Sequence, residues 1–150
     1  MEKYDTELEA RVWKRVRGEA EECPCPLELQ PLAAAEWAEA AMYLMLSRQM
    51  QGSRKGLLRQ LFEQERAHAD CLKGMHQMMT GKPLSLRTPP PSVQMPEQAL
   101  RKCYANTLRR LGEYEKRSDD PQYGHVFQKM AEEEKQHCRM LLELVGSMKG

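Results

Sequence analysis

The sequence predicts an all-α protein, a four-helix bundle made of two antiparallel helical hairpins and preceded by a short N-terminal helix. Three observations support this class. Charged residues make up 30% of the chain and aromatic residues only 6%, a composition that favours helices over sheets. Apolar residues recur at helical spacing in five segments. One long proline-rich segment, 81–98, separates the last two of these segments from the others.

The N-terminal segment is expected to form its own short helix over 1–20. Its apolar residues follow one another at spacing four: Leu8, Val12 and Val16. The Cys-Pro-Cys-Pro stretch that begins at Cys23 ends this helix, and we interpret it as a turn with two reduced thiols, Cys23 and Cys25. We therefore divide the chain into an N-terminal segment, 1–30, and a bundle domain, 31–150, which is long enough to bury a core.

The four helices of the bundle follow from the breaks between them. They are expected over 31–50, 54–79, 97–118 and 121–148. Short breaks at Gln51-Gly52-Ser53 and at Asp119-Asp120-Pro121 make the two helices of each pair antiparallel. The connection between the pairs, roughly 17 residues, can span up to about 56 Å, whereas a 20-residue helix is about 30 Å long. The connection can therefore run the full length of the bundle.

Charge and hydropathy exclude several classes of function. The formal net charge is +1, from 23 basic and 22 acidic residues, so nucleic acid is not expected as a partner. No apolar run approaches the roughly 18 residues of a membrane span, and the charged N-terminus lacks an apolar signal-peptide core. The five cysteines include no Cys-x-x-Cys pair, which argues against a disulfide framework. We expect a cytoplasmic protein without a membrane partner.

Two Glu-x-x-His motifs are the candidates for chemistry. Glu65 and His68 lie in the second bundle helix, and Glu134 and His137 lie in the fourth. Residues three apart share one face of a helix, so each motif directs a carboxylate and an imidazole at one point. Both motifs interrupt the apolar stripe that faces the core. Because a buried carboxylate needs a counter-charge, a cation shared by the two motifs is the simplest solution. Chance pairs on a solvated helix surface are the alternative.

The first bundle helix adds Glu36 and Glu39, either of which can point inward. Glu36 precedes the break at 51–53 by about as many residues as Glu65 follows it, and Glu134 lies at a similar distance beyond the second break. Antiparallel packing then places these three carboxylates in one layer of the bundle. The predicted metal ligands are Glu36, Glu65, His68, Glu134 and His137.

This pattern resembles the rubrerythrin branch of the ferritin-like di-iron carboxylate superfamily. Glu36 with Tyr43 seven residues later matches the family's first element, and the two Glu-x-x-His motifs match its second and last. The segment VFQKMAEEEKQHCRMLLEL also resembles the family's last helix, and the resemblance covers roughly 31–148. It implies a ferritin-like bundle that holds two iron ions, with Tyr43 hydrogen-bonded to a ligand carboxylate. Carboxylate and imidazole ligands also suit manganese or zinc.

The same resemblance implies an oxidoreductase, a peroxidase or ferroxidase that reduces peroxide or dioxygen or oxidises ferrous iron. Glu36, Glu65, Glu134 and Tyr43 would then take catalytic roles. No rubredoxin-like Cys-x-x-Cys pairs follow the bundle, so the electron donor is expected to be a separate molecule. The family also favours a homodimer.

The third bundle helix departs from the family pattern. The depth of the other ligands falls near 103–107, where Cys103 stands but no carboxylate does. Glu113 and Glu115 are too near the break, by about 12 Å at 1.5 Å per residue. The site is then five-ligand, asymmetric, completed by water, or able to hold only one metal tightly. Two alternatives therefore stay open: a metal-binding or metal-sensing bundle without turnover, and a structural or partner-binding bundle with an incomplete site.

Overall fold

The computed structural model describes residues 28–92 and 95–148. Within these ranges the chain forms four α-helices and no strand, which confirms the all-helical class. The helices are α2 (Gln30–Gln49), α3 (Gly52–Thr80), α4 (Pro96–Lys116) and α5 (Gly124–Ser147). The predicted helix over 1–20 and the Cys23–Cys25 stretch lie outside the described residues.

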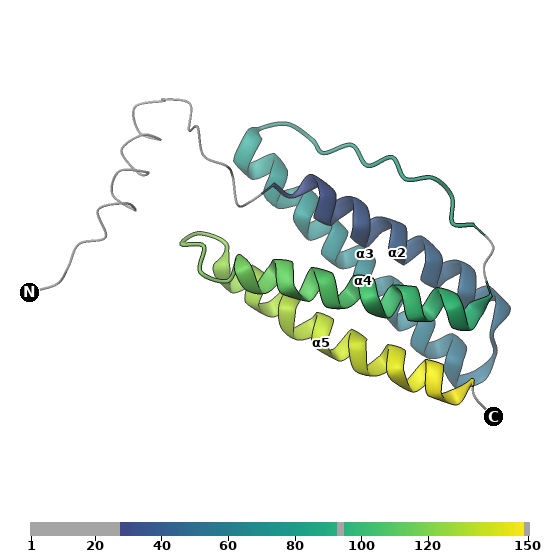
Figure 1. Cartoon of the computed structure of the whole chain (residues 1–150). Coiled ribbons are helices and arrows are strands. Elements are labelled where there is room, and N and C mark those ends of the chain that lie inside the picture. Colours follow the sequence, from purple (N-terminus) through teal and green to yellow (C-terminus); the bar gives the residue numbers. More distant parts are fainter. Residues whose placement is uncertain (1–27, 93–94, 149–150) are drawn as a thin grey trace, which may run out of the picture.

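The helices pair as two hairpins, α2 with α3 and α4 with α5 (Figure 1). The described part of the connection, 81–92, leaves the end of α3 and runs back along the bundle toward the start of α4 (Figure 1). Because the chain returns to the opposite end before α4 begins, α4 points the same way as α3. The remaining neighbours, α3 with α5 and α2 with α4, are therefore also antiparallel.

The helix ends have local causes. Gly81 adopts a left-handed conformation with φ of 72° and donates its backbone N–H to the Gln77 carbonyl at 2.8 Å, which ends α3. The Asp120 carboxylate accepts the backbone N–H groups of Gln122 and Tyr123 at 3.0 and 2.7 Å. These bonds hold a turn, so α5 begins at Gly124, slightly later than predicted.

Gly124 itself stands where the chain enters α5. A Cβ atom at this position would collide with the backbone oxygen of Ser118. The close approach of the turn to the helix start therefore requires glycine.

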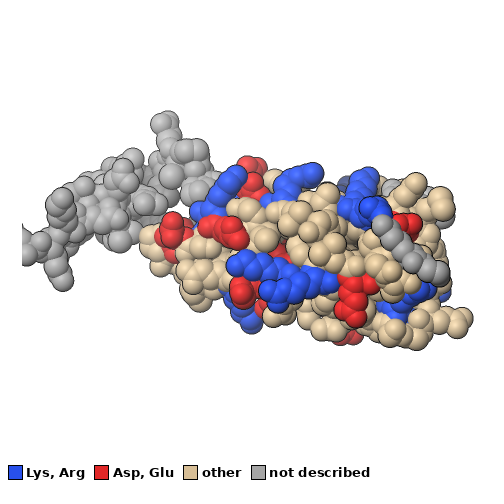
Figure 2. Space-filling model, turned by 60° about the horizontal axis from the view of Figure 1, so that its bottom comes forward, with Lys and Arg blue, Asp and Glu red and all other residues tan. Residues whose placement is uncertain are grey.

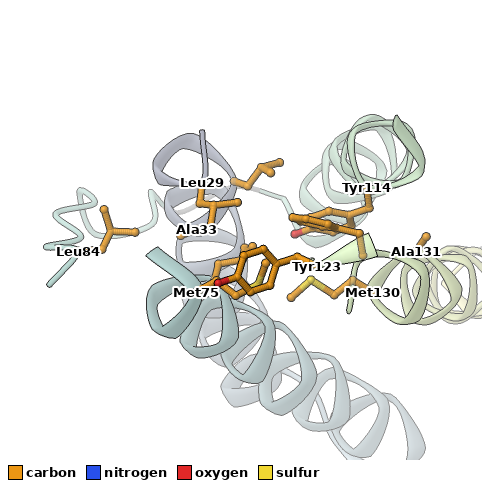
Figure 3. Packing of buried hydrophobic residues seen from close by; sticks show 11 residues of the cluster. Leu29, Ala33, Met75, Leu84, Tyr114, Tyr123, Met130 and Ala131 are labelled. Atoms are coloured by element: carbon orange, nitrogen blue, oxygen red, sulfur yellow. The ribbon is translucent and has the colours of Figure 1, made fainter. Parts of the chain in front are cut away.

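The hydrophobic core consists of two clusters, one toward each end of the bundle. The first, which Figure 3 shows, contains Leu29, Leu32, Ala33, Leu72, Met75, Leu84, Tyr114, Tyr123, Phe127, Met130 and Ala131. The second contains Tyr43, Leu46, Leu58, Leu61, Ala99, Leu100, Cys103, Leu141 and Leu144. Leu84 comes from the long connection, which thereby packs against the end of the bundle. Along each helix buried polar residues lie between the two clusters, and these polar residues form the candidate site.

The surface carries both signs of charge. On the face that Figure 2 shows, Lys and Arg side chains are interspersed with Asp and Glu. None of the described helices is both long enough and apolar enough to cross a membrane.

Candidate metal centre

A layer of buried polar side chains separates the two hydrophobic clusters. Its members are Glu36, Glu39, Glu65, His68, Thr107, Arg110, Glu134 and His137, each at most 5% exposed. All four helices contribute, because each carries polar residues at positions where its apolar stripe continues on both sides. Burying four carboxylates is costly, so every one of them requires a counter-charge or a hydrogen-bond donor.

Four of these residues form a compact group of potential metal ligands. One ligand atom from each of Glu36, Glu65, His68 and Glu134 can be chosen so that all four lie within 4.8 Å of one another. Three helices supply them: α2 the first, α3 the next two and α5 the last. Three carboxylates and an imidazole arranged in this way can surround a single cation. The structure therefore brings together four of the five residues that the sequence predicts as ligands.

His68 is oriented by carboxylates on both ring nitrogens. Its Nε2 donates to Glu133 Oε2 at 2.6 Å, at the edge of the layer. Its Nδ1 faces inward and lies 3.1 Å from Glu134 Oε1 and 3.4 Å from Glu36 Oε1. An outer partner on one ring nitrogen fixes which nitrogen faces the site, as is typical of metal-binding histidines. In this centre Nδ1 is the atom placed to ligate.

His137 repeats this arrangement from the opposite helix. Its Nδ1 faces inward, 2.7 Å from Glu65 Oε1, and its Nε2 is hydrogen-bonded to the side-chain oxygen of Gln64. Gln64 immediately precedes Glu65, just as Glu133 immediately precedes the other motif glutamate. The residue that precedes each motif glutamate thus orients the histidine of the other motif. His137 lies beside the four-residue group, with its ring 5.6 Å from that of His68, but does not belong to it.

Arg110 of α4 lies in the middle of the carboxylates. Its Nη1 and Nη2 donate to the two oxygens of Glu39 at 2.9 and 2.7 Å. Its Nη2 also donates to Glu65 Oε2 at 3.2 Å and lies 3.6 Å from Glu134 Oε2. Its Nε lies 3.3 Å from Glu36 Oε1. One guanidinium therefore contacts all four carboxylates of the layer.

Sequence reasoning missed Arg110 because it stands about one turn beyond the expected depth. Side chains of a helix point toward its N-terminus, so a long side chain reaches a level N-terminal to its own Cα. One feature of the sequence could have identified it. Arg110 stands four residues before Tyr114 and seven after Cys103, and because both of these residues are buried, Arg110 lies on the inward face of α4. An arginine on such a face needs carboxylate partners, and these had already been identified.

The Glu39 carboxylate is bound by the Arg110 guanidinium through both of its oxygens. Its Oε1 also accepts the hydroxyls of Tyr43 at 2.6 Å and Thr107 at 3.0 Å, so both of its oxygens have donors. Tyr43, expected on a ligand carboxylate, therefore lies on a glutamate outside the four-residue group. The hydroxyl that reaches Glu36 belongs to Tyr114 of α4, at 2.5 Å.

Burial and neighbouring charges change the pKa values across the layer. Burial raises the pKa of Glu65, and the nearby charges of Glu36 and Glu134 raise it further, against a lowering by Arg110. Burial lowers the pKa of Arg110, but the charges of three surrounding carboxylates raise it well above its usual value. The guanidinium is therefore a permanent cation in this layer.

The remaining two shifts have opposite directions. Burial lowers the pKa of His68, but its interactions with Glu134 and Glu36 outweigh burial and raise it to about 11. Burial raises the pKa of Glu134, but hydrogen bonds with His137 and His68 hold it below its usual range. Without a metal ion, the Glu134 carboxylate is thus ionised and faces a protonated His68.

Three carboxylate oxygens in the layer remain without a hydrogen bond to any described residue. They are Glu36 Oε2, Glu65 Oε1 and Glu134 Oε2, and the inward-facing His137 Nδ1 shares this property. Glu65 Oε1 and His137 Nδ1 lie 2.7 Å apart without the geometry of a hydrogen bond. Buried carboxylate oxygens are normally satisfied, so the oxygens of Glu36 and Glu134 point to a cation as their missing partner. The donor set fits a transition metal such as iron, manganese or zinc.

A groove between α2 and α4 leads from the surface to this layer. It has a volume of about 660 Å³ and reaches Glu39 and Arg110. Small side chains, including Ala35, Ala38 and Ala99, line it. Cys103 also lines the groove; it lies in the second hydrophobic cluster and outside the ligand group, and burial raises its pKa to about 12. The groove therefore borders the layer on the side of Glu39 and Arg110, and none of the four residues of the ligand group lines it.

Comparison of the chain with protein-family models, with curated proteins and with solved structures finds no match.

Proposed function

We propose that the chain is a metal-binding protein with a ferritin-like bundle, in which Glu36, Glu65, His68 and Glu134 hold a transition metal ion. One observation carries the proposal: these four buried residues offer ligand atoms within 4.8 Å of one another. The carboxylate oxygens that lack hydrogen bonds support it, because a cation would satisfy them. The order of the helices and the long connection agree with the ferritin-like connectivity.

We further propose that the bound metal is redox-active iron and that the protein is an oxidoreductase of the rubrerythrin kind. Iron would supply electrons to peroxide or dioxygen, or would itself be oxidised from the ferrous state. The chain's own contribution is to bind and orient. Glu133 and Gln64 hold the two imidazoles in place, and the groove between α2 and α4 reaches the layer at Glu39 and Arg110. A separate electron donor, a cytoplasmic location and a homodimer belong to this proposal.

The test of metal binding compares two glutamates of α3. Glu65→Gln removes a buried ligand and should abolish tight metal binding, whereas Glu63→Gln changes an exposed residue of the same helix and should leave it intact. Metal content is measured by mass spectrometry on protein purified from its native source without added metal. Native protein without any transition metal, or equal metal content in both variants, would contradict the proposal.

The redox part has its own test. Iron-loaded protein should consume hydrogen peroxide, or oxidise added ferrous iron under air, faster than the Glu65→Gln variant does. If the iron-loaded protein does neither, the remaining interpretation is a metal-binding bundle without turnover.

Arg110 favours a second candidate function, a structural bundle without metal. The guanidinium contacts every buried carboxylate and in part neutralises the layer by itself. In that case metal-free protein should be as stable as protein given iron or manganese, by thermal unfolding with and without a chelator. Stabilisation by metal would exclude this candidate.

A further inference from the structure

We propose that Arg110 fills the place of a second metal ion, so that the centre holds one ion per chain. The inference rests on the proposed metal binding and concerns the number of ions. It follows from where the guanidinium lies, from the ligands that remain for a second ion, and from the permanence of the arginine charge.

The position of Arg110 is that of a cation shared by two carboxylates. Glu134 directs Oε1 toward His68 and Oε2 toward Arg110 Nη2, at 3.1 and 3.6 Å. Glu65 likewise directs Oε2 toward Arg110 Nη2 at 3.2 Å. In two-metal centres each bridging carboxylate directs one oxygen to each ion, and the ions are about 3.5–4 Å apart. Here the guanidinium stands where the second set of oxygens converges.

A second ion would also lack ligands. His137 is the one histidine left for it, and the described part of α4 offers no carboxylate at this depth. Glu113 of α4 is engaged at the surface with Arg117 at 2.8 Å and Lys116 at 3.3 Å. Glu39, the remaining buried carboxylate, holds the guanidinium through both of its oxygens. His137 therefore serves Glu65, which it contacts at 2.7 Å, rather than a metal.

The arginine charge cannot be removed to make room. A guanidinium stays charged at any pH at which the protein is folded, so it cannot become a metal ligand. A metal ion bound to the same oxygens would sit about 2.0–2.2 Å from them, within contact distance of this fixed positive charge. The bidentate bond to Glu39 further holds the guanidinium in this place.

The experiment counts ions in the full chain by equilibrium dialysis against manganese(II), with bound metal per chain determined by mass spectrometry. The native chain should bind one tight ion. Arg110→Lys is the matched control that keeps a positive charge, and it should also bind one. Arg110→Glu removes the cation and supplies a carboxylate from α4, and it should bind two. Paramagnetic resonance gives a second readout, since two adjacent manganese ions couple magnetically and a single ion does not.

The outcomes separate this inference from the proposed function. Two ions in the native chain would overturn the inference and leave metal binding standing. A folded Arg110→Glu chain that binds one ion would also overturn it. No ion in the native chain would overturn the proposed function instead. Arg110→Met, which removes the charge without adding a carboxylate, covers the case in which Arg110→Glu fails to fold, and it should show weak binding of a second ion.

Discussion

The two halves of the polar layer are built differently. The half that α3 and α5 supply is nearly twofold symmetric, with a Glu-x-x-His motif on each helix and an oxygen-bearing residue before each glutamate to orient the opposite histidine. The half that α2 and α4 supply has no such repeat. There α2 contributes two carboxylates, Glu36 and Glu39, and α4 contributes donors, Arg110, Thr107 and Tyr114.

The two halves therefore neutralise their buried carboxylates in different ways. The symmetric half leaves oxygens of Glu65 and Glu134 without hydrogen bonds, as is also true of Glu36 on α2, a feature that suits an exchangeable cation. The asymmetric half satisfies Glu39 completely with groups of the chain itself. We infer that metal binding belongs to the first half together with Glu36, and structural stability to the rest of the second half. Each prediction below would break or sharpen that division.

The largest expected effect is the loss of the internal cation. Arg110→Met should destabilise the metal-free protein by about 3–5 kcal/mol, because breaking a buried ion pair from one side leaves uncompensated carboxylates. Chemical denaturation in the presence of a chelator measures this. Arg109→Met, at an exposed position on the same helix, should stay within about 0.5 kcal/mol of the native protein. Adding Glu39→Met to Arg110→Met should recover part of the loss; no recovery would mean that Glu39 is not the main partner.

The second prediction compares one carboxylate from each half. Glu134→Gln should weaken metal binding by about 100-fold or more, because loss of a ligand should reduce the affinity at least as much as loss of a residue that only orients a ligand. Glu39→Gln should lower stability and leave metal affinity within a few-fold. Isothermal titration with manganese(II) measures both affinities. Equal weakening by the two substitutions would erase the division between the halves.

The third prediction concerns the residues that orient the histidines. Glu133→Ala should weaken metal binding by about 10-fold or more, as loss of an outer partner does, since His68 Nε2 bonds Glu133. Gln64→Ala should change the affinity by less than about threefold, because its partner His137 lies outside the ligand group. The same titration compares them. A larger effect of Gln64→Ala would make His137 a ligand.

The smallest expected effects come from Tyr43 and Tyr114, the two buried tyrosines that donate to carboxylates. Tyr43→Phe and Tyr114→Phe should each lower stability by about 1–2 kcal/mol, because each removes a buried hydrogen bond to a carboxylate. Only Tyr114→Phe should also change metal affinity, since its hydroxyl holds Glu36 and that of Tyr43 holds Glu39. Denaturation and metal titration on the two variants test this difference.

Much of the fold was predictable because its signals are local. Apolar spacing along each segment predicted four bundle helices whose observed ends differ by only a few residues, and the proline-rich segment predicted the long connection. The Glu-x-x-His spacing and the distances from the breaks also predicted that five residues would meet, of which Glu36, Glu65, His68 and Glu134 form the group and His137 lies beside it. Helical periodicity is a property of neighbouring residues, and depth in an antiparallel hairpin follows from counting along the chain.

What only the tertiary structure decided is how each polar atom is satisfied. Whether Glu36 or Glu39 joins the ligand group depends on Arg110, a residue of another helix whose long side chain reaches back by about one turn. Contacts between helices likewise decide that Gln64 of α3 and Glu133 of α5 each bond the histidine of the opposite helix. They also decide that Tyr114 bonds Glu36. Sequence alone determined which faces are buried. Partner choice within the buried layer needed the packed bundle, because side-chain reach and rotamer, rather than position along a helix, set those distances.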